Sequence, residues 1–234
     1  MQLSSVVPWG RSLAEYRAMF ALSDEDLEGL ILGCGDGAAS FNAELSARGG
    51  RVLSVDPIYQ FSAAEIQQRI RQVYPGMLSQ LARRADQYLW RHFHDPGHLG
   101  SVRMSAMNRF LEDYPVGSQQ GRYIDASVPE LPCFDREYDL ALCSHLLFVY
   151  SEQIDLDAHI SAISELCRVA REVRIYPLVA EDGRPSAHLP AVIRHLATQG
   201  LELGMQRVDY QFQKGACDML WIKSPEATAS DISE

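Results

Sequence analysis

Short apolar runs alternate with longer amphipathic segments over most of the chain. The apolar runs predict strands at residues 29–32, 51–56, 122–125, 138–144 and 172–178. Helices are expected between them at residues 38–47, 156–170 and 189–198. Strands separated by helices of this length form βαβ units, so the strands should lie parallel in a sheet that helices cover on both faces. The pattern therefore predicts an α/β fold.

One long interval between the second and third predicted strands breaks this alternation. Helical periodicity is present at residues 62–73, 75–93 and 102–114, and the breakers YPG and HDPGHLG separate these segments. We expect a helical cap inserted at about residues 60–121. Such an insertion lies above the carboxyl ends of the strands, where it would form a wall of a ligand pocket.

The two ends of the chain contribute further elements. Residues 8–20 have the pattern of an amphipathic helix whose apolar face carries Leu13, Tyr16, Met19 and Phe20. Residues 206–223 contain two alternating runs joined at QKGA, which predicts an antiparallel hairpin. We expect a single domain over residues 1–224 and a flexible polar tail over residues 225–234.

Composition and charge narrow the possible partners. The 234 residues carry a net charge of -10, which argues against general binding to nucleic acids or to anionic membranes. The charge is uneven, because residues 60–121 hold seven arginines against five acidic residues and are suited to face an anionic group. No apolar run has the length of a membrane span, the N-terminus lacks the pattern of a secretion signal, and the five cysteines form no CxxC pair. A cytoplasmic protein is expected, and its oligomeric state stays open.

The segment LILGCGDGAASF, residues 30–41, is the main candidate for a binding loop. A predicted strand runs into Gly33, Gly35 and Gly37 and then into a helix, which exposes backbone N–H groups at the positive end of the helix dipole. Glycine permits positive φ in such a turn and lets a flat or charged ligand lie on the backbone. By itself the pattern is equally typical of a tight strand-to-helix turn.

Asp56 strengthens the functional interpretation of this loop. It ends the next predicted strand, 21 residues after Gly35, where a carboxylate accepts hydrogen bonds from both hydroxyl groups of a ribose. Loop and carboxylate together suit a nicotinamide or flavin dinucleotide, and they suit S-adenosylmethionine equally well. Their spacing alone does not separate the two ligand classes.

Four segments decide between these ligands. LILGCGDG, VLSVDPIY, RYIDASVPELP and EYDLALCSHLLFVY occur in an order and spacing that resemble a class I S-adenosylmethionine-dependent methyltransferase. The predicted terminal hairpin is similar to the reversed last strand of that family. The resemblance extends over about residues 27–223, interrupted by the helical interval. It implies a Rossmann-like, seven-stranded, mostly parallel sheet.

The resemblance also implies roles for particular residues. The cofactor-binding residues within its motifs are Gly33, Cys34, Gly35, Gly37, Asp56, Pro57, Ile58, Asp125, Ala126 and Ser144. The glycines would approach the methionine and ribose part of S-adenosylmethionine, and the carboxylate of Asp56 would hold the ribose hydroxyls. Pro57 and Ile58 would pack on the adenine. Asp125 and Ala126, after the third strand, would contact the edge of the adenine ring. Ser144 and His145 would lie beneath the sulfonium.

One position departs from the family pattern. The family commonly has an acidic residue two positions before the first glycine, where this chain has Ile31. The ammonium group of the cofactor then needs another acceptor, such as a backbone carbonyl of the loop. Asp36 is close in sequence, but capping of the following helix is the favoured interpretation of its carboxylate. Arg11, before the first strand, would clamp the cofactor carboxylate through two hydrogen bonds.

Methyl transfer from a sulfonium needs few catalytic groups, because the acceptor has only to be aimed at the methyl group and to lose any proton it carries. His145 is the candidate general base, with a purely structural histidine as an equal alternative. A serine-nucleophile elbow, a P-loop lysine and an HExxH motif are absent from the sequence. No metal is expected, because the spacing of His92, His94 and His98 does not place ligands on one helix face.

The sequence therefore predicts a methyltransferase that acts on a small molecule or on an acceptor the sequence leaves undefined, since the acceptor depends on the insertion rather than on the sheet. The segment CSHL lacks the Asn/Asp-Pro-Pro-aromatic motif of nitrogen methylation, which disfavours a nucleobase acceptor. Two alternatives stay open. A nicotinamide-dependent oxidoreductase is opposed by the terminal hairpin and by the lack of a Tyr-xxx-Lys motif at the only two lysines, Lys214 and Lys223. A non-catalytic protein that binds S-adenosylmethionine or S-adenosylhomocysteine is favoured by Ile31.

Overall fold

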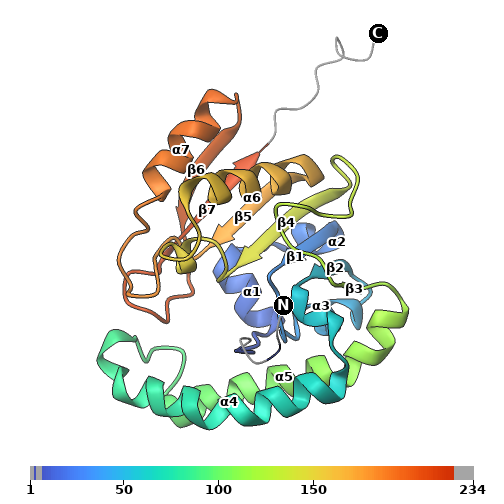
Figure 1. Cartoon of the computed structure of the whole chain (residues 1–234), viewed down its shortest axis with the longest axis vertical. Helices are drawn as coiled ribbons and strands as arrows, with labels where there is room; N and C mark the ends of the chain where they lie inside the picture. The colour runs from blue at the N-terminus through green and yellow to red at the C-terminus, as the bar shows by residue number, and fades with distance from the viewer. Residues whose placement is uncertain (1–2, 4–6, 224–234) are drawn as a thin grey trace.

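The computed structural model describes residue 3 and residues 7–223. Its centre is a sheet of seven strands in the order β3-β2-β1-β4-β5-β7-β6 (Figure 1). The strands are β1 (Leu30–Cys34), β2 (Arg51–Val55), β3 (Tyr123–Ile124), β4 (Tyr138–Ser144), β5 (Ala170–Tyr176), β6 (Glu202–Arg207) and β7 (Asp218–Lys223). The first five pair in parallel, whereas β7 is antiparallel to both β5 and β6. This confirms the expected α/β fold, including the reversed last strand.

Helices cover both faces of the sheet, as expected. On one face, α1 (Leu13–Phe20) and α3 (Phe41–Ser46) pack with β1 in one apolar cluster. On the other face, α6 (Leu156–Val169) and α7 (Leu189–Thr198) pack against β4, β5 and β7. The short helix α2 (Asp24–Glu28) leads into β1. The apolar face expected for the first helix is confirmed, because Leu13, Tyr16, Met19 and Phe20 are all buried.

The insertion after β2 is helical, but its helices differ from the predicted ones. It consists mainly of α4 (Ala63–Arg83) and α5 (Pro96–Gln119), which lie side by side along one end of the molecule (Figure 1). The predicted break before Pro75 is wrong, since α4 continues through this proline and its packing against α5 outweighs the one lost backbone hydrogen bond.

The connection between α4 and α5 was predicted as helix and is not. It contains the 3-10 turn η3 (Ala85–Gln87), followed by turns and bends. Helix α5 starts six residues earlier than predicted, because Asp95 caps its N-terminus and Pro96 occupies its first turn, where a missing N–H costs nothing. The connection is thereby free to pack against the C-terminal part of the chain.

The C-terminal hairpin is present, with a shifted first strand. Strand β6 begins four residues before the predicted start and ends at Arg207, so residues 208–217 form a long connection to β7. Val208 and Tyr210, whose alternation suggested a strand, are buried in the cluster that contains α1. The expected tail over residues 225–234 lies outside the described residues. None of the helices in residues 3 and 7–223 combines the length and apolar character of a membrane span.

Candidate functional site

The glycine loop lies where three parallel strands end together. Cys34, the last residue of β1, pairs in register with Val55 of β2 and with Cys143 of β4. The strand order reverses between β1 and β4, which is the point where open α/β sheets bind ligands. Gly35 and Gly37 have φ values of 72° and 54°, which explains the need for glycine at both positions.

Asp56 fastens this loop to the end of β2. Its Oδ2 accepts a hydrogen bond of 2.9 Å from the N–H of Gly37, and its Oδ1 accepts one of 2.8 Å from the N–H of Ile58. Burial raises the pKa of this carboxyl group above its ordinary value. Each oxygen keeps a lone pair for a further donor, so the carboxylate is able to bind hydroxyl groups as well as the backbone.

A first cavity of about 310 Å³ opens beside this carboxylate. Its walls come from all three strand ends and from α6, and they include Gly35, Asp56, Pro57, Ala126, Leu146 and Ile154. Most of this lining is apolar, whereas Asp56 supplies a carboxylate at one side. The cavity therefore suits a flat apolar ring joined to a group that carries hydroxyls.

The predicted cofactor residues are distributed unevenly around this cavity. Cys34 lines it, whereas Asp125 lines an adjoining surface groove that also includes Ala126. The side chain of Ile58 lies in a separate core cluster with Tyr59, so only its backbone N–H faces Asp56. Sequence position alone does not distinguish these orientations, because consecutive residues after a strand turn in different directions.

Asp36 does not cap the following helix, and the favoured interpretation of its carboxylate was wrong. The N-cap of α3 is Ser40, while the carboxylate of Asp36 is buried between two hydroxyl donors. Tyr16 donates to its Oδ1 and Ser54 to its Oδ2, each at 2.6 Å. A Cβ atom on Gly33 would overlap this carboxylate, so the first glycine of the loop makes room for Asp36 rather than for a ligand.

The position of Asp36 bears on the missing acid of the family pattern. Side chains of Ile31 and of residue 33 point to the same face of β1, because strand side chains alternate. The carboxylate over Gly33 therefore lies on the face of the sheet to which an acid at position 31 would point. Burial raises the pKa of Asp36 to about 6, against the effect of its two hydroxyl donors.

His145 lies at the end of β4 in a backbone conformation that is uncommon for histidine. Its φ is 50°, and its N–H donates to the carbonyl oxygen of Tyr176 at 2.7 Å. The ring atom Nδ1 is 3.1 Å from the hydroxyl oxygen of Ser144, and Nε2 has no hydrogen-bond partner among the described residues. Burial and the cations of Arg11 and Arg103 lower the pKa of His145 well below its ordinary value, so the imidazole is neutral at pH 7.

A second cavity, of about 210 Å³, lies on the other side of this strand end. His145 lines it, whereas the next residue, Leu146, lines the first cavity. Arg11 also lines the second cavity, so the structure brings it together with His145 rather than with the ribose side of the loop. Further walls come from α4, the connection after it, and the connection between β6 and β7.

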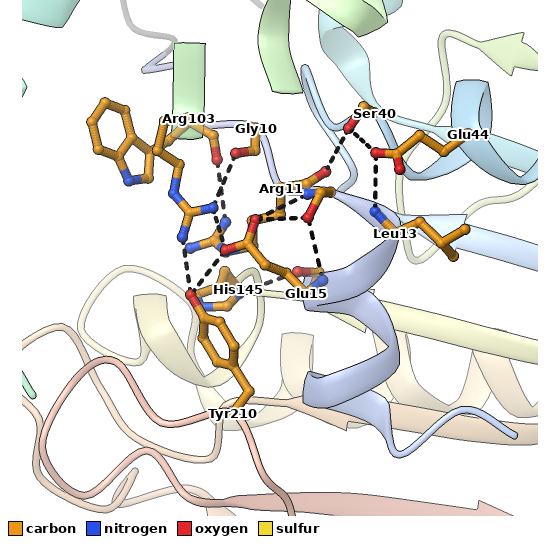
Figure 2. Close-up of polar contacts among 12 residues, drawn as sticks. Gly10, Arg11, Leu13, Glu15, Ser40, Glu44, Arg103, His145 and Tyr210 are labelled. Atoms are coloured by element: carbon orange, nitrogen blue, oxygen red, sulfur yellow. Dashed lines mark hydrogen bonds and ion pairs between the residues drawn. The ribbon is translucent and has the colours of Figure 1, made fainter. Parts of the chain in front are cut away.

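A buried polar network joins the elements around the second cavity (Figure 2). Arg103 of α5 forms an ion pair with Glu15 of α1 and donates to the hydroxyl of Tyr210 at 2.9 Å, and that hydroxyl donates to Glu15 at 3.1 Å. Because Arg103 pairs with Glu15, Arg11 forms no ion pair within the described residues. Its Nη1 donates to the carbonyl oxygen of Trp9 at 3.3 Å, and its Nε is enclosed without a partner.

The sequence reasoning did not find the residues that complete the site. Arg103, Glu15 and Tyr210 come from distant parts of the chain and have no local motif. Tyr16 was assigned only to an apolar face, and its hydroxyl partner was not expected. The three histidines of the insertion do not converge, since His94 stacks on His98 while His92 stacks on a different ring, Tyr210. Within the described residues, no group of three or more potential ligands is placed to hold a metal ion.

No protein-family model matches this chain. An uncharacterized protein of Methanocaldococcus jannaschii is 28% identical over 224 residues, which cover 95% of this chain and 98% of that protein. The two proteins are thus similar over nearly their whole lengths.

Solved structures similar to this chain are S-adenosylmethionine-dependent methyltransferases. Magnesium protoporphyrin IX methyltransferase from Synechocystis PCC 6803 with bound S-adenosylhomocysteine is 14% identical with a TM-score of 0.48, covering 90% of this chain and 80% of that one. A methyltransferase from Aquifex aeolicus is 13% identical with a TM-score of 0.42, covering 83% and 81%. A putative methyltransferase from Methanococcus maripaludis is 10% identical with a TM-score of 0.45, covering 93% and 85%. At sequence identities and TM-scores this low, the similarity says nothing about activity. The activity has to be inferred from the site of this chain.

Proposed function

We propose that this protein is a methyltransferase that uses S-adenosylmethionine as methyl donor and acts on a small-molecule acceptor in the cytosol. The observation that carries the proposal is the carboxylate of Asp56, held by the glycine loop at the side of an apolar cavity. This arrangement matches a nucleoside, since the ring is apolar and flat while the ribose presents two hydroxyl donors. The five cysteines, an odd number without a CxxC pair, agree with a reducing compartment.

The residues around the first cavity fit the adenosine part. Pro57, Ala126 and Ile154 would contact the adenine, and Asp56 would accept from the ribose hydroxyls with the lone pairs that the backbone leaves free. The positive φ of Gly35 keeps the loop backbone close to Leu146 and free of side chains at this point. These residues would orient the nucleoside so that its sulfur end points along the loop.

Two charged residues fit the amino acid part. Arg11 would bind the carboxylate, because its guanidinium has an enclosed Nε without a partner and no ion pair in the described part of the chain. Burial and the neighbouring Arg103 lower the pKa of Arg11, which a bound anion would offset. Asp36 would supply the negative charge for the ammonium group in place of the acid missing at Ile31.

His145 would act on the acceptor. When bound, S-adenosylmethionine supplies a methyl group on a sulfonium, an already activated leaving group. His145 would take the acceptor proton at Nε2, which is free while Nδ1 is held by Ser144. The low pKa of His145 keeps the imidazole in its neutral, proton-accepting form at pH 7.

Calorimetry with S-adenosylmethionine, S-adenosylhomocysteine and NAD tests the ligand class. We expect both sulfur nucleosides to bind and NAD to give no heat. Binding of NAD with neither sulfur nucleoside would overturn the proposal in favour of the oxidoreductase alternative. Transfer of a labelled methyl group to any component of a metabolite extract, abolished in Asp56→Ala, separates an enzyme from a non-catalytic binding protein.

A truncated ligand tests the two charged residues. 5′-Methylthioadenosine contains the adenosine part of the cofactor but lacks its amino and carboxyl groups. We expect Arg11→Met and Asp36→Asn each to weaken S-adenosylhomocysteine about tenfold or more, and to leave 5′-methylthioadenosine unchanged. Equal losses for both ligands would contradict these assignments.

A further inference from the structure

Five aromatic side chains line the second cavity. Trp9 comes from the N-terminal segment, Tyr88 from the insertion, Tyr176 from the end of β5, and Tyr210 and Phe212 from the connection between β6 and β7. Four separate parts of the chain thus place rings around one space. Aromatic rings pack most favourably against other rings, in offset or edge-to-face contacts.

Two of the three tyrosines at this cavity have hydroxyls that are already engaged with the protein. Tyr176 donates to the carbonyl oxygen of Ala216 at 2.8 Å, and Tyr210 donates to Glu15 while accepting from Arg103. These two residues therefore present ring carbons rather than free hydroxyls to an occupant.

The aromatic walls are held in place before any ligand binds. Tyr88 stacks on Phe212 with ring centroids 4.5 Å apart, and the N–H of Leu89 donates to the carbonyl oxygen of Phe212 at 2.7 Å. These contacts fasten the insertion to the connection between β6 and β7. A preformed slot of this kind costs little ordering when a rigid flat ligand enters it.

The polar groups at the cavity select the functional group of the occupant. Nε2 of His145 has no partner in the described residues and is suited to accept a hydrogen bond from a hydroxyl group. Arg11 and the buried Arg103 place positive charge beside the same ring, and Glu15 is occupied by Arg103. Glu181 also lines the cavity, so charge alone excludes neither an amine nor a hydroxyl, and it is the free Nε2 of His145 that favours an occupant with a hydroxyl proton to donate.

From these observations we propose that the second cavity binds a small aromatic alcohol of the phenol or catechol class, with its hydroxyl on Nε2 of His145. A volume of about 210 Å³ limits the occupant to one ring, or to two fused rings. The binding of an aromatic alcohol in this cavity does not depend on the proposed function. Only the further statement that this alcohol is the methyl acceptor rests on it. In that reaction the hydroxyl oxygen forms the new bond to the methyl carbon, the carbon–sulfur electron pair stays on sulfur, and the proton passes to His145.

Binding measurements test the proposal without requiring turnover. Catechol and cyclohexane-1,2-diol, which has the same hydroxyl spacing but no aromatic ring, are titrated into the protein saturated with S-adenosylhomocysteine. We expect catechol to bind at least tenfold more tightly than the diol. Phe212→Leu, which keeps apolar volume but removes a ring, should weaken catechol about tenfold and leave S-adenosylhomocysteine unchanged.

Control variants separate the cavity from general effects. Phe134→Leu changes a phenylalanine that is 82% exposed and outside both cavities, so it should leave catechol binding unchanged. His145→Ala should weaken catechol more than methoxybenzene, which has no hydroxyl proton to donate. Equal affinity for catechol and the diol, or an unaltered affinity in Phe212→Leu, would overturn the inference.

The two proposals fail in distinguishable ways. If S-adenosylhomocysteine binds but no aromatic ligand does, the aromatic site is wrong and the proposed function stands. If catechol binds at His145 in the protein alone but neither sulfur nucleoside binds, the aromatic site stands and the proposed function is wrong.

Discussion

Asp36 is the residue whose role changed most between sequence and structure. Its carboxylate is enclosed by Tyr16 and Ser54 and covers Gly33, so four positions of the chain depend on one another. Two hydroxyl donors do not compensate fully for the loss of water, which is why the pKa of Asp36 rises to about 6. In the proposed complex, the ammonium group of the cofactor would supply the missing positive charge.

The raised pKa of Asp36 predicts a pH-dependent stability. The folded state binds this proton more tightly than the unfolded state, so its contribution to stability falls as pH rises through the interval from about 4 to about 6. The free energy of unfolding of the protein, relative to Asp36→Asn, should therefore fall by about 2.4 kcal/mol between pH 4 and pH 7. Urea denaturation of both proteins at the two pH values measures this difference. A difference that does not change with pH would show that Asp36 titrates normally.

Asp56 has a structural role in the loop and a proposed role in binding the ribose. A ligand without the ribose hydroxyls distinguishes the two roles. Asp56→Ala should cost about 1–3 kcal/mol of stability, because the N–H groups of Gly37 and Ile58 lose their acceptor. The unchanged protein should bind S-adenosylhomocysteine at least tenfold more tightly than its 2′,3′-dideoxy analogue, and Asp56→Ala should lose this preference. Calorimetry measures both ligands. A preference that persists in Asp56→Ala would place the ribose elsewhere.

At the scale of elements, the network of Glu15, Arg103 and Tyr210 joins α1, α5 and the connection between β6 and β7. Glu15 and Arg103 are 8% and 1% exposed, so their charges are compensated mainly by each other. The Glu15 carboxylate lies beside the Arg103 cation, which lowers the pKa of Glu15 and opposes the effect of burial. The insertion is thereby fastened to the rest of the molecule at the side of the second cavity.

Removing one partner of this network should be costly. Arg103→Met leaves Glu15 buried without its cation and should lower the free energy of unfolding by about 3–5 kcal/mol. Adding Glu15→Leu to Arg103→Met should recover part of this loss, because no unpaired charge then stays buried. The matched control is Arg17→Met, which breaks a more exposed pair with Asp24 and should cost no more than about 1 kcal/mol. Equal losses in the two single variants, measured by urea denaturation, would refute the special role of the network.

At the scale of the whole molecule, the two cavities lie on either side of the residues that follow β4. After β4, His145 lines the second cavity and Leu146 lines the first. The loop after β1 also lines the first cavity. The sheet therefore supplies the cofactor side of the proposed site. The N-terminal segment, the insertion and the connection between β6 and β7 supply the acceptor side, which lies between parts of the chain rather than within one of them.

Ligand binding to the folded state should raise the thermal stability of the whole molecule. At a concentration of one hundred times its dissociation constant, S-adenosylhomocysteine should add about 2.7 kcal/mol, which for a chain of this size raises Tm by roughly 5–10 °C. NAD at the same concentration should give no shift. Scanning calorimetry measures both. A shift with NAD alone would contradict the proposed ligand class.

Local patterns in the sequence were enough to predict the order of strands and helices and the proposed cofactor side of the site. Strand β4 and helix α7 have the predicted ends, because apolar periodicity is a local property of the chain. The glycine loop and Asp56 were found for a related reason, since a parallel sheet brings the ends of neighbouring strands to one edge. Local breakers were less reliable: Pro75 did not end its helix, because packing against α5 compensates for one lost hydrogen bond.

The second cavity and the role of Asp36 depend on contacts between residues far apart in the chain, which the sequence does not reveal. Glu15 and Arg103 are 88 residues apart in the chain, and Glu15 and Tyr210 are 195 residues apart. No local sequence pattern therefore predicts these contacts. The alternation over residues 208–212 suggested a strand, whereas these residues bring Tyr210 and Phe212 to the wall of the cavity. Periodicity tells which residues are apolar along one element. Which elements then face each other depends on packing over the whole chain, and that packing forms the proposed acceptor site.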